Sequence, residues 1–418
     1  MSLSQNILTK TRKLIPARLV NYSINILFNT GLFFLIFSLG DIKIKFFFNK
    51  LDLMTAIIPL FLSLGIERVF PFEQNGFNSR QIFSNLFFII SIITLIIFSI
   101  TLIINIDYVF AVFLGFIYSY ANLSVNIMII SNDFNKKFIF ENTIKLVFLS
   151  LFTAYVYFTE TRLSINSLIT LFVIITTFLL ISNYKIFLQK YDLKSFAEKY
   201  IYKSKYILYL ILLGTFFGNI PRIFEIFFGT EDLSVKFFFW IKLIAYLSAL
   251  GMLYNYIILR YLIKDEGFLR VKKSAIYSLI IYAIIITFLN FLNAKVDINL
   301  FLENRITPIY LVIFCLTTFL GYIKDLYIEN LMSINLDFRK KFIIFFKVVF
   351  FNLCFSTLLY YLNYLNAFSV LTIMFLSSIY WFFLGLSAIE HSLLNKKFLI
   401  KAILIFVITG IINTFFFI

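Results

Sequence analysis

The chain is dominated by apolar runs that are each long enough to cross a lipid bilayer and are separated by short charged loops. A helix needs roughly 20 apolar residues to span about 30 Å of hydrocarbon. The runs lie at residues 19–39, 51–70, 82–104, 108–131, 138–158, 163–183, 207–228, 235–259, 275–293, 307–328, 342–364, 367–389 and 398–418. Because little chain is left outside them, the sequence predicts an all-α, polytopic integral membrane protein with about 12–13 transmembrane helices in two six-helix bundles.

Composition supports a membrane location. Of the 418 residues, 61% are hydrophobic and only 14% are charged, whereas about a quarter of a soluble domain is charged. The first apolar run is long and has no small-residue cleavage site, so we expect it to remain as a membrane anchor and not to be removed as a signal peptide.

Basic residues are distributed unevenly between alternate loops. With a cytoplasmic N-terminus, the inner loops hold 23 Lys and Arg residues and the outer loops hold 6. Cytoplasmic loops of membrane proteins carry such an excess, so the pattern predicts that orientation. Topology and attraction to anionic lipid account for the net charge of +16, and a nucleic-acid partner is not needed to explain it.

The chain is expected to contain two bundles joined by a basic linker. Residues 1–183 form the predicted N-terminal six-helix bundle, 184–206 the cytoplasmic linker and 207–397 the C-terminal six-helix bundle, while 398–418 is a further candidate span. The linker also has the composition of an interfacial helix. The segments 32–41 and 222–232 both run from aromatic and aliphatic residues to a glycine and then an acid, which is either an internal repeat of the kind found in transporters or a chance match.

The sequence offers little for catalysis or metal binding. Cys315 and Cys354 lie in predicted spans without metal or redox spacing, and His391, the single histidine, lies in a loop. The outer loops are short, whereas membrane enzymes that polymerise or transfer sugars usually carry catalytic acids on a large one. We therefore expect no enzyme activity, no catalytic residues, no cofactor and no metal.

Charged residues inside spans are costly and usually face a bundle interior or a water-filled cavity. Arg222 and Glu225 are three residues apart, on one face of the seventh span. Pro221 precedes them and is expected to kink the helix. The pair is read either as an intrahelical ion pair near the outer surface or as part of a moving element that contacts an anion.

Other charged residues in the spans extend this group. Glu67 and Arg68 form either a pair at the headgroup level or a charge-balanced cavity group, and Lys242 is deep enough to face the interior. Lys145 and Lys347 are expected to reach the membrane surface along the helix. Lys324 and Asp325 are further candidates on the tenth span. Basic residues outnumber acids in the spans, so the interior is expected to attract an anion.

A stripe of asparagines follows one face of the first span. Asn21, Asn25 and Asn29 are spaced four residues apart and therefore align along the helix. Such a stripe either makes hydrogen bonds between helices or lines a cavity that binds sugar, and the sequence does not separate these two roles.

One segment carries a resemblance to a known family. The run GNIPRIFEIFFGTEDLSVKFFFW at 218–240 places Asn219, Pro221, Arg222, Glu225 and Gly229 in a seventh-helix pattern, and GIERVF at 65–70 places Gly and Arg in the second span. Together with the two bundles and basic middle loop, the chain resembles the polysaccharide flippase family (O-antigen, or Wzx-type) of the MATE-like exporter superfamily.

The resemblance implies a transporter that moves undecaprenyl-pyrophosphate-linked oligosaccharide across the bacterial inner membrane for O-antigen, lipopolysaccharide or capsule synthesis. It also implies a polysaccharide polymerase and a chain-length regulator as partners, beside membrane lipid. For this role the residues expected to bind substrate are Arg222, Arg68, Lys242, Lys324, Asn25 and Asn29. Those expected to couple an ion or balance charge are Glu225, Asp325 and Glu67.

Two other classes of protein fit the pattern less well. A membrane polysaccharide polymerase, ligase or glycosyltransferase would need a large outer loop with acids, Arg or His. A MATE-like small-molecule antiporter would favour buried acids over buried bases, and Glu225 and Asp325 are the acids available for that role.

Overall fold

A computed structural model describes residues 3–63, 79–104, 108–130, 134–159, 162–189, 191–198, 219–232, 234–243, 245–246, 338–364 and 366–388, together with isolated positions at 280–317 and 397–412. Every regular element within these ranges is a helix. The chain divides into two compact units, Met1–Thr215 and Phe216–Ile418, and each is described by itself.

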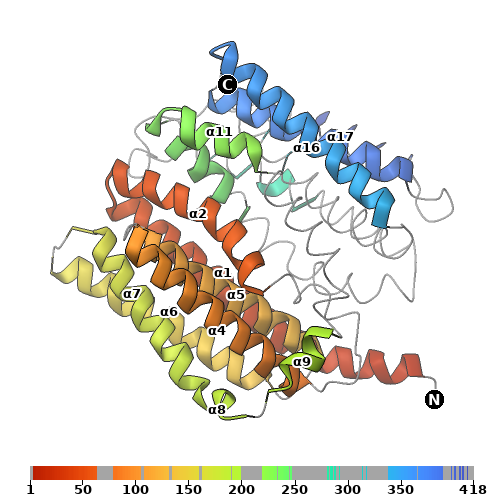
Figure 1. Cartoon of the computed structure of the whole chain (residues 1–418). Helices are drawn as coiled ribbons and strands as arrows, with labels where there is room; N and C mark the ends of the chain where they lie inside the picture. Colours follow the sequence, from red (N-terminus) through yellow and green to blue (C-terminus); the bar gives the residue numbers. More distant parts are fainter. Residues whose placement is uncertain are drawn as a thin grey trace. The chain divides into compact units, whose positions relative to one another are not determined.

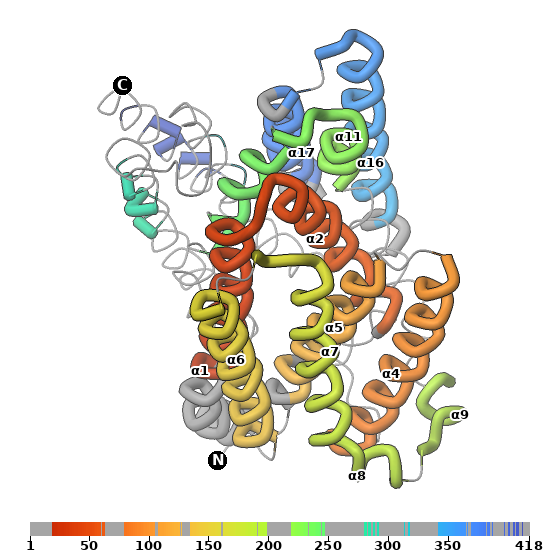
Figure 2. The backbone as a smooth tube through the Cα atoms, turned by 90° about the vertical axis from the view of Figure 1, so that its left-hand side faces the viewer, coloured from red at the N-terminus to blue at the C-terminus, as the bar shows by residue number. Residues whose placement is uncertain are grey.

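The first unit is a bundle of long helices that run side by side (Figures 1 and 2). The long helices are α1 (Leu3–Leu39), α2 (Ile42–Ser63), α4 (Ser79–Ile104), α5 (Val109–Ile130), α6 (Asn135–Phe158) and α7 (Ile165–Ser182). Two short helices follow them, α8 (Tyr184–Phe187) and α9 (Leu193–Phe196). Helix α5 packs against α1, α2, α4 and α7 and so forms the centre of this bundle.

Local sequence signals explain how these helices begin and approach one another. Ser164 starts α7 with a reciprocal cap, in which the side chains of Ser164 and Ser167 each accept a hydrogen bond from the other's backbone N–H. At Gly115 of α5, an added Cβ would lie 2.4 Å from Cγ2 of Ile58 in α2. The glycine therefore allows α2 and α5 to pack at close range, as small residues do between membrane helices.

The helices have the dimensions of membrane spans. Within the described residues, five helices are long and apolar enough to cross a bilayer, namely Leu19–Leu39, Ser79–Ile104, Asn135–Phe158, Ile165–Ser182 and Phe342–Tyr361. Several large apolar side chains, such as Leu95 and Ile103 of α4, are exposed and suit contact with lipid. The prediction of an all-α polytopic membrane protein is confirmed, while the full number of spans stays a prediction.

The described part of the second unit contains α11 (Ile220–Phe228), α16 (Phe338–Tyr361) and α17 (Ala367–Ala388). Helix α11 packs against both α16 and α17 (Figure 1). The rings of Phe228 and Tyr360 join α11 to α16 at 4.6 Å between centroids, and those of Phe345 and Trp381 join α16 to α17 at 4.2 Å. These aromatic contacts hold α11, which carries the main predicted site.

Candidate functional site

Helix α11 begins at Ile220 with Asn219 as its cap residue and Pro221 in its first turn. Proline is well suited to this position, because a first-turn N–H has no partner within the helix. Pro221 therefore helps α11 to start where the sequence analysis expected it to kink a continuing span. Residues 211–218, just before the cap, lie outside the described part of the chain.

Arg222 and Glu225 are both buried on α11, with relative exposures of 7% and 2%. Burial places both side chains inside the protein and not at an exposed surface, and the charge of Arg222 acts on the carboxylate of Glu225. Neither carboxylate oxygen of Glu225 has a donor within hydrogen-bonding distance among the described residues, although Arg222 and the hydroxyl of Ser234 both interact with the carboxylate. A buried carboxylate is costly when ionised, and these two neighbours offset part of that cost.

Two predicted substrate-binding cations come together around one aromatic ring. The guanidinium carbon of Arg222 lies 5.3 Å from the centroid of Phe238, and Nζ of Lys242 lies 5.7 Å from the same centroid. Phe238 is fully buried in the helical stretch 234–243. An aromatic face attracts cations, so the ring of Phe238 interacts with two positive charges, those of the buried Arg222 and the half-buried Lys242.

A glycine ends a helix in each unit with the same backbone hydrogen bond, and different residues precede the two glycines. The N–H of Gly229 donates to the carbonyl of Glu225 at 2.8 Å, and the N–H of Gly40 donates to the carbonyl of Ile36 at 2.9 Å. Another helix follows at once in each case. The positions seven and four residues before the glycine hold Phe33 and Ile36 in α1, and Arg222 and Glu225 in α11.

The two segments compared as a possible repeat therefore end their helices with the same backbone hydrogen bond, while the repeat itself stays a prediction. Phe33 and Ile36 are fully buried, so the matched positions face a core in both units. The charges of Arg222 and Glu225 are not required by this turn, because apolar side chains fill the same places in α1. This difference points to a role for the charges beyond folding.

The asparagine stripe on α1 packs against α6. The side chain of Asn142 donates a hydrogen bond to Oδ1 of Asn21, and Nζ of Lys145 donates to Oδ1 of Asn25 at 3.1 Å. Two of the three asparagines thus make contacts between helices, the first of the two roles considered. Asn29 is half-buried and makes no hydrogen bond among the described residues.

Lys145 corrects one expectation from the sequence. Its side chain is only 1% exposed and points to α1, where it contacts Asn25, so it does not reach toward the membrane surface. Lys347 of α16 is exposed, as expected. Depth along a span did not separate the two lysines, because the deciding factor is which face of the helix each occupies.

A second buried carboxylate was missed as a site by the sequence analysis. Glu141 of α6 is 1% exposed and accepts hydrogen bonds from Tyr120 of α5, from Ser182 at 2.7 Å and from Asn183 at 3.1 Å. Nζ of Lys137 lies 3.8 Å from the carboxylate. These contacts join α5, α6 and the end of α7. The signal in the sequence is the four-residue spacing of Lys137, Glu141 and Lys145, which places them on one face of a helix.

Several predicted site residues lie outside the described part of the chain, namely Glu67, Arg68, Lys324 and Asp325. Within the part that is described, no group of three His, Cys, Asp or Glu side chains could hold a metal ion. Of the cations predicted to bind substrate, the structure describes Arg222 and Lys242, and both contact the ring of Phe238.

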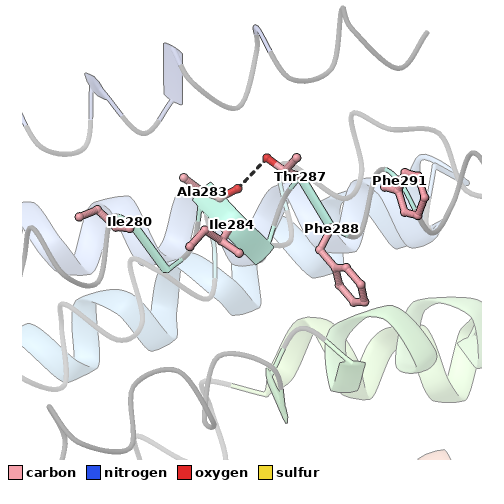
Figure 3. Close-up of a pocket in the computed structure, with 6 residues that line it drawn as sticks. All are labelled: Ile280, Ala283, Ile284, Thr287, Phe288 and Phe291. Carbon is pink, nitrogen blue, oxygen red and sulfur yellow. Dashed lines mark hydrogen bonds between the residues drawn. The ribbon is translucent and has the colours of Figure 1, made fainter.

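An open apolar pocket lies elsewhere in the second unit (Figure 3). The residues that line it are Ile280, Ala283, Ile284, Thr287, Phe288 and Phe291. The hydroxyl of Thr287 donates to the carbonyl of Ala283 on its own helix at 2.9 Å, so it is already engaged. The described lining residues are uncharged and suit contact with lipid tails.

No known family model matches the chain, and no curated protein matches it either. Among solved structures, a MOP superfamily transporter from Pyrococcus furiosus, in which reverse polarity of the binding pocket suggests a different function, aligns with 90% of this chain and 94% of its own at 14% identity and a TM-score of 0.45. An outward-facing multidrug resistance MATE family transporter of the MOP superfamily aligns with 97% of this chain and 96% of its own at 14% identity and a TM-score of 0.48. Both scores lie below 0.5, so the functional site rests on the residues of this chain alone.

Proposed function

We propose that this protein is a membrane transporter that flips undecaprenyl-pyrophosphate-linked oligosaccharide from the cytoplasmic to the outer leaflet of the bacterial inner membrane. The proposal extends to O-antigen or capsule synthesis as the pathway. A polysaccharide polymerase and a chain-length regulator would then act next on the flipped units.

The observation that carries this proposal is the approach of Arg222 and Lys242 to Phe238. A pyrophosphate is a compact polyanion, and two cations in a weakly polar setting attract it more strongly than they would in water. Arg222 can also hold phosphate oxygens through two parallel N–H donors. The long apolar helices leave lipid in contact with the protein, which suits a substrate that keeps its polyprenyl tail in the bilayer.

Flipping needs no bond to break, so the proposed role for these residues is binding and charge neutralisation. The headgroup would bind the cations while exposed to one side and leave them when the other side opens, as transporters that alternate access do. Glu225 lies one turn from Arg222 on α11. Its charge would oppose the phosphate and favour release, or would couple the step to an ion.

The test uses purified protein in liposomes with a fluorescent lipid-linked oligosaccharide, read as the fraction made accessible to a membrane-impermeant reagent. Wild-type protein should flip the substrate, and Arg222→Ala and Lys242→Gln should slow it. The matched control is Lys236→Gln, since Lys236 lies on the same helical stretch but pairs with Asp232 at 2.5 Å. Equal rates in Arg222→Ala and Lys236→Gln proteins would remove the pyrophosphate from the proposal.

One observation favours a second function, a MATE-like small-molecule antiporter. Glu225 is a buried acid with no described donor within hydrogen-bonding distance of its carboxylate, and such a group can bind a proton or an organic cation. An antiporter would move a cationic dye against a proton or sodium gradient and would ignore the lipid-linked oligosaccharide. The two substrates, tested in the same liposomes, separate the two functions.

A further inference from the structure

The chain that leaves α7 does not run free as a linker but folds back onto α4. The ring of Phe187 lies 5.3 Å from that of Phe87, and the ring of Tyr191 stacks on Phe88 at 4.3 Å. The hydroxyl of Ser84 donates to Oε1 of Gln189 at 3.0 Å. Figure 2 shows α8 and α9 at the same end of the first unit, beside α4 and α7.

Internal contacts hold this segment in shape. The hydroxyl of Tyr191 donates to the carbonyl of Ile186 at 2.5 Å, and partial burial raises the pKa of that hydroxyl, which keeps it protonated. Asp192 caps α9 by accepting from the N–H of Ser195 at 3.1 Å, and Phe196 is fully buried. The residues 184–189 and 191–196, here called the docked linker, are therefore a folded part of the first unit.

The opposite side of the docked linker combines exposed apolar and basic residues. Leu188 is 79% exposed and Tyr184 is 54% exposed. Lys185 and Lys194 of the same segment are also exposed. Large exposed apolar groups beside lysines are typical of segments that lie in the headgroup layer of a membrane, where tyrosine is also enriched.

The position of the docked linker along the membrane normal follows from α7. This helix is a candidate span that ends at Ser182, and the docked linker begins two residues later. A segment that starts where a span ends and folds back along the bundle lies at the boundary between hydrocarbon and headgroups.

We propose that the docked linker is a binding surface for anionic phospholipid. Leu188 inserts among the upper acyl chains, while Lys185 and Lys194 contact the phosphates and negative headgroups. Attraction between juxtamembrane lysines and anionic lipid is a general source of such binding.

The experiment places an environment-sensitive label at Leu188→Cys in full-length protein whose Cys315 and Cys354 are replaced by serine. The labelled protein is placed in nanodiscs of neutral phosphatidylcholine or of an equal mixture with anionic phosphatidylglycerol. We expect the anionic lipid to lower quenching of the label by acrylamide, a neutral aqueous quencher, at least threefold. Equal quenching in the two lipids would overturn the proposal.

Charge variants and a second label complete the test. Lys185→Gln combined with Lys194→Gln should abolish the difference between the two lipids, whereas Arg162→Gln, which removes a charge before the opposite end of α7, should keep it. A label at Leu151→Cys, an exposed position in the α6 span, should respond alike in all variants and so reports intact folding. A difference that survives in the double lysine variant would contradict the proposal.

Discussion

The glycines Gly40 and Gly229 each end a helix by donating a hydrogen bond to the carbonyl four residues earlier, but the side chains before them differ in charge. In α1, the places seven and four residues before the glycine hold Phe33 and Ile36, whereas in α11 they hold Arg222 and Glu225. All four side chains are buried. Since apolar residues satisfy the turn in α1, the charged pair of α11 adds a desolvation cost that this turn does not require.

The two buried carboxylates make the contrast sharper. Glu141 accepts hydrogen bonds from Tyr120, Ser182 and Asn183, while no described donor lies within hydrogen-bonding distance of the carboxylate of Glu225, which interacts with Arg222 and Ser234. The hydrogen bonds of Glu141 connect helices, whereas we propose that Glu225 serves a ligand or an ion. The variants below test this division of roles, from the largest expected effect to the smallest.

Replacement of Arg222 should have the largest effect. We expect Arg222→Ala to abolish transport and Arg222→Lys to retain part of it, because a diphosphate responds more to charge than to the forked shape of the guanidinium. The measurement is surface polysaccharide restored to cells that lack the gene, normalised to protein abundance. Full activity of Arg222→Ala at normal abundance would remove this residue from the site.

Loss of the charge at Glu225 should separate transport from stability. Glu225→Gln is expected to lower transport at least tenfold, because the variant can neither repel the phosphate nor bind an ion. Its melting temperature in detergent should change little, since the amide oxygen of Gln can still face Arg222 and Ser234. A clear fall in melting temperature with transport intact would show that Glu225 is a structural residue.

Replacement of Glu141, in contrast, should lower stability. Glu141→Ala leaves Tyr120 and Asn183 without their acceptor and removes the charge beside Lys137, which should lower the free energy of unfolding by about 3 kcal/mol. Glu141→Gln should cost less, because the amide oxygen still accepts. Unfolding in a graded series of denaturing detergent measures both, and an unchanged stability in Glu141→Ala would contradict the assigned role.

The smallest effects are expected along the asparagine stripe. Asn25→Ala removes the acceptor of a buried lysine and should cost about 1.5–3 kcal/mol, the range for a hydrogen bond to a charged group. Asn29→Ala removes no hydrogen bond within the described residues and should change stability by less than about 0.5 kcal/mol. If Asn29→Ala instead reduced transport, the predicted sugar contact would hold for that position alone.

The sequence predicted the fold class because long apolar runs leave few alternatives in lipid. Charge within an apolar run is also visible in the sequence, and it led to Arg222 and Lys242 as predicted substrate-binding residues, a role that stays a prediction. The sequence could not show that both meet at Phe238, because that contact joins α11 to the following helical stretch through side-chain direction. The cluster at Glu141 and the burial of Lys145 were missed for the same reason, since each depends on which helix packs against α6.

The most direct test of the central claim is to isolate lipid-linked sugars from cells lacking the gene and to determine which leaflet holds them. The account predicts that complete single repeat units accumulate on the cytoplasmic side and that the wild-type gene releases them, while the Arg222→Ala gene does not. Units that accumulate unpolymerised on the outer side would instead indicate a polymerase or ligase. No accumulation in either leaflet would contradict polysaccharide export and favour a small-molecule antiporter.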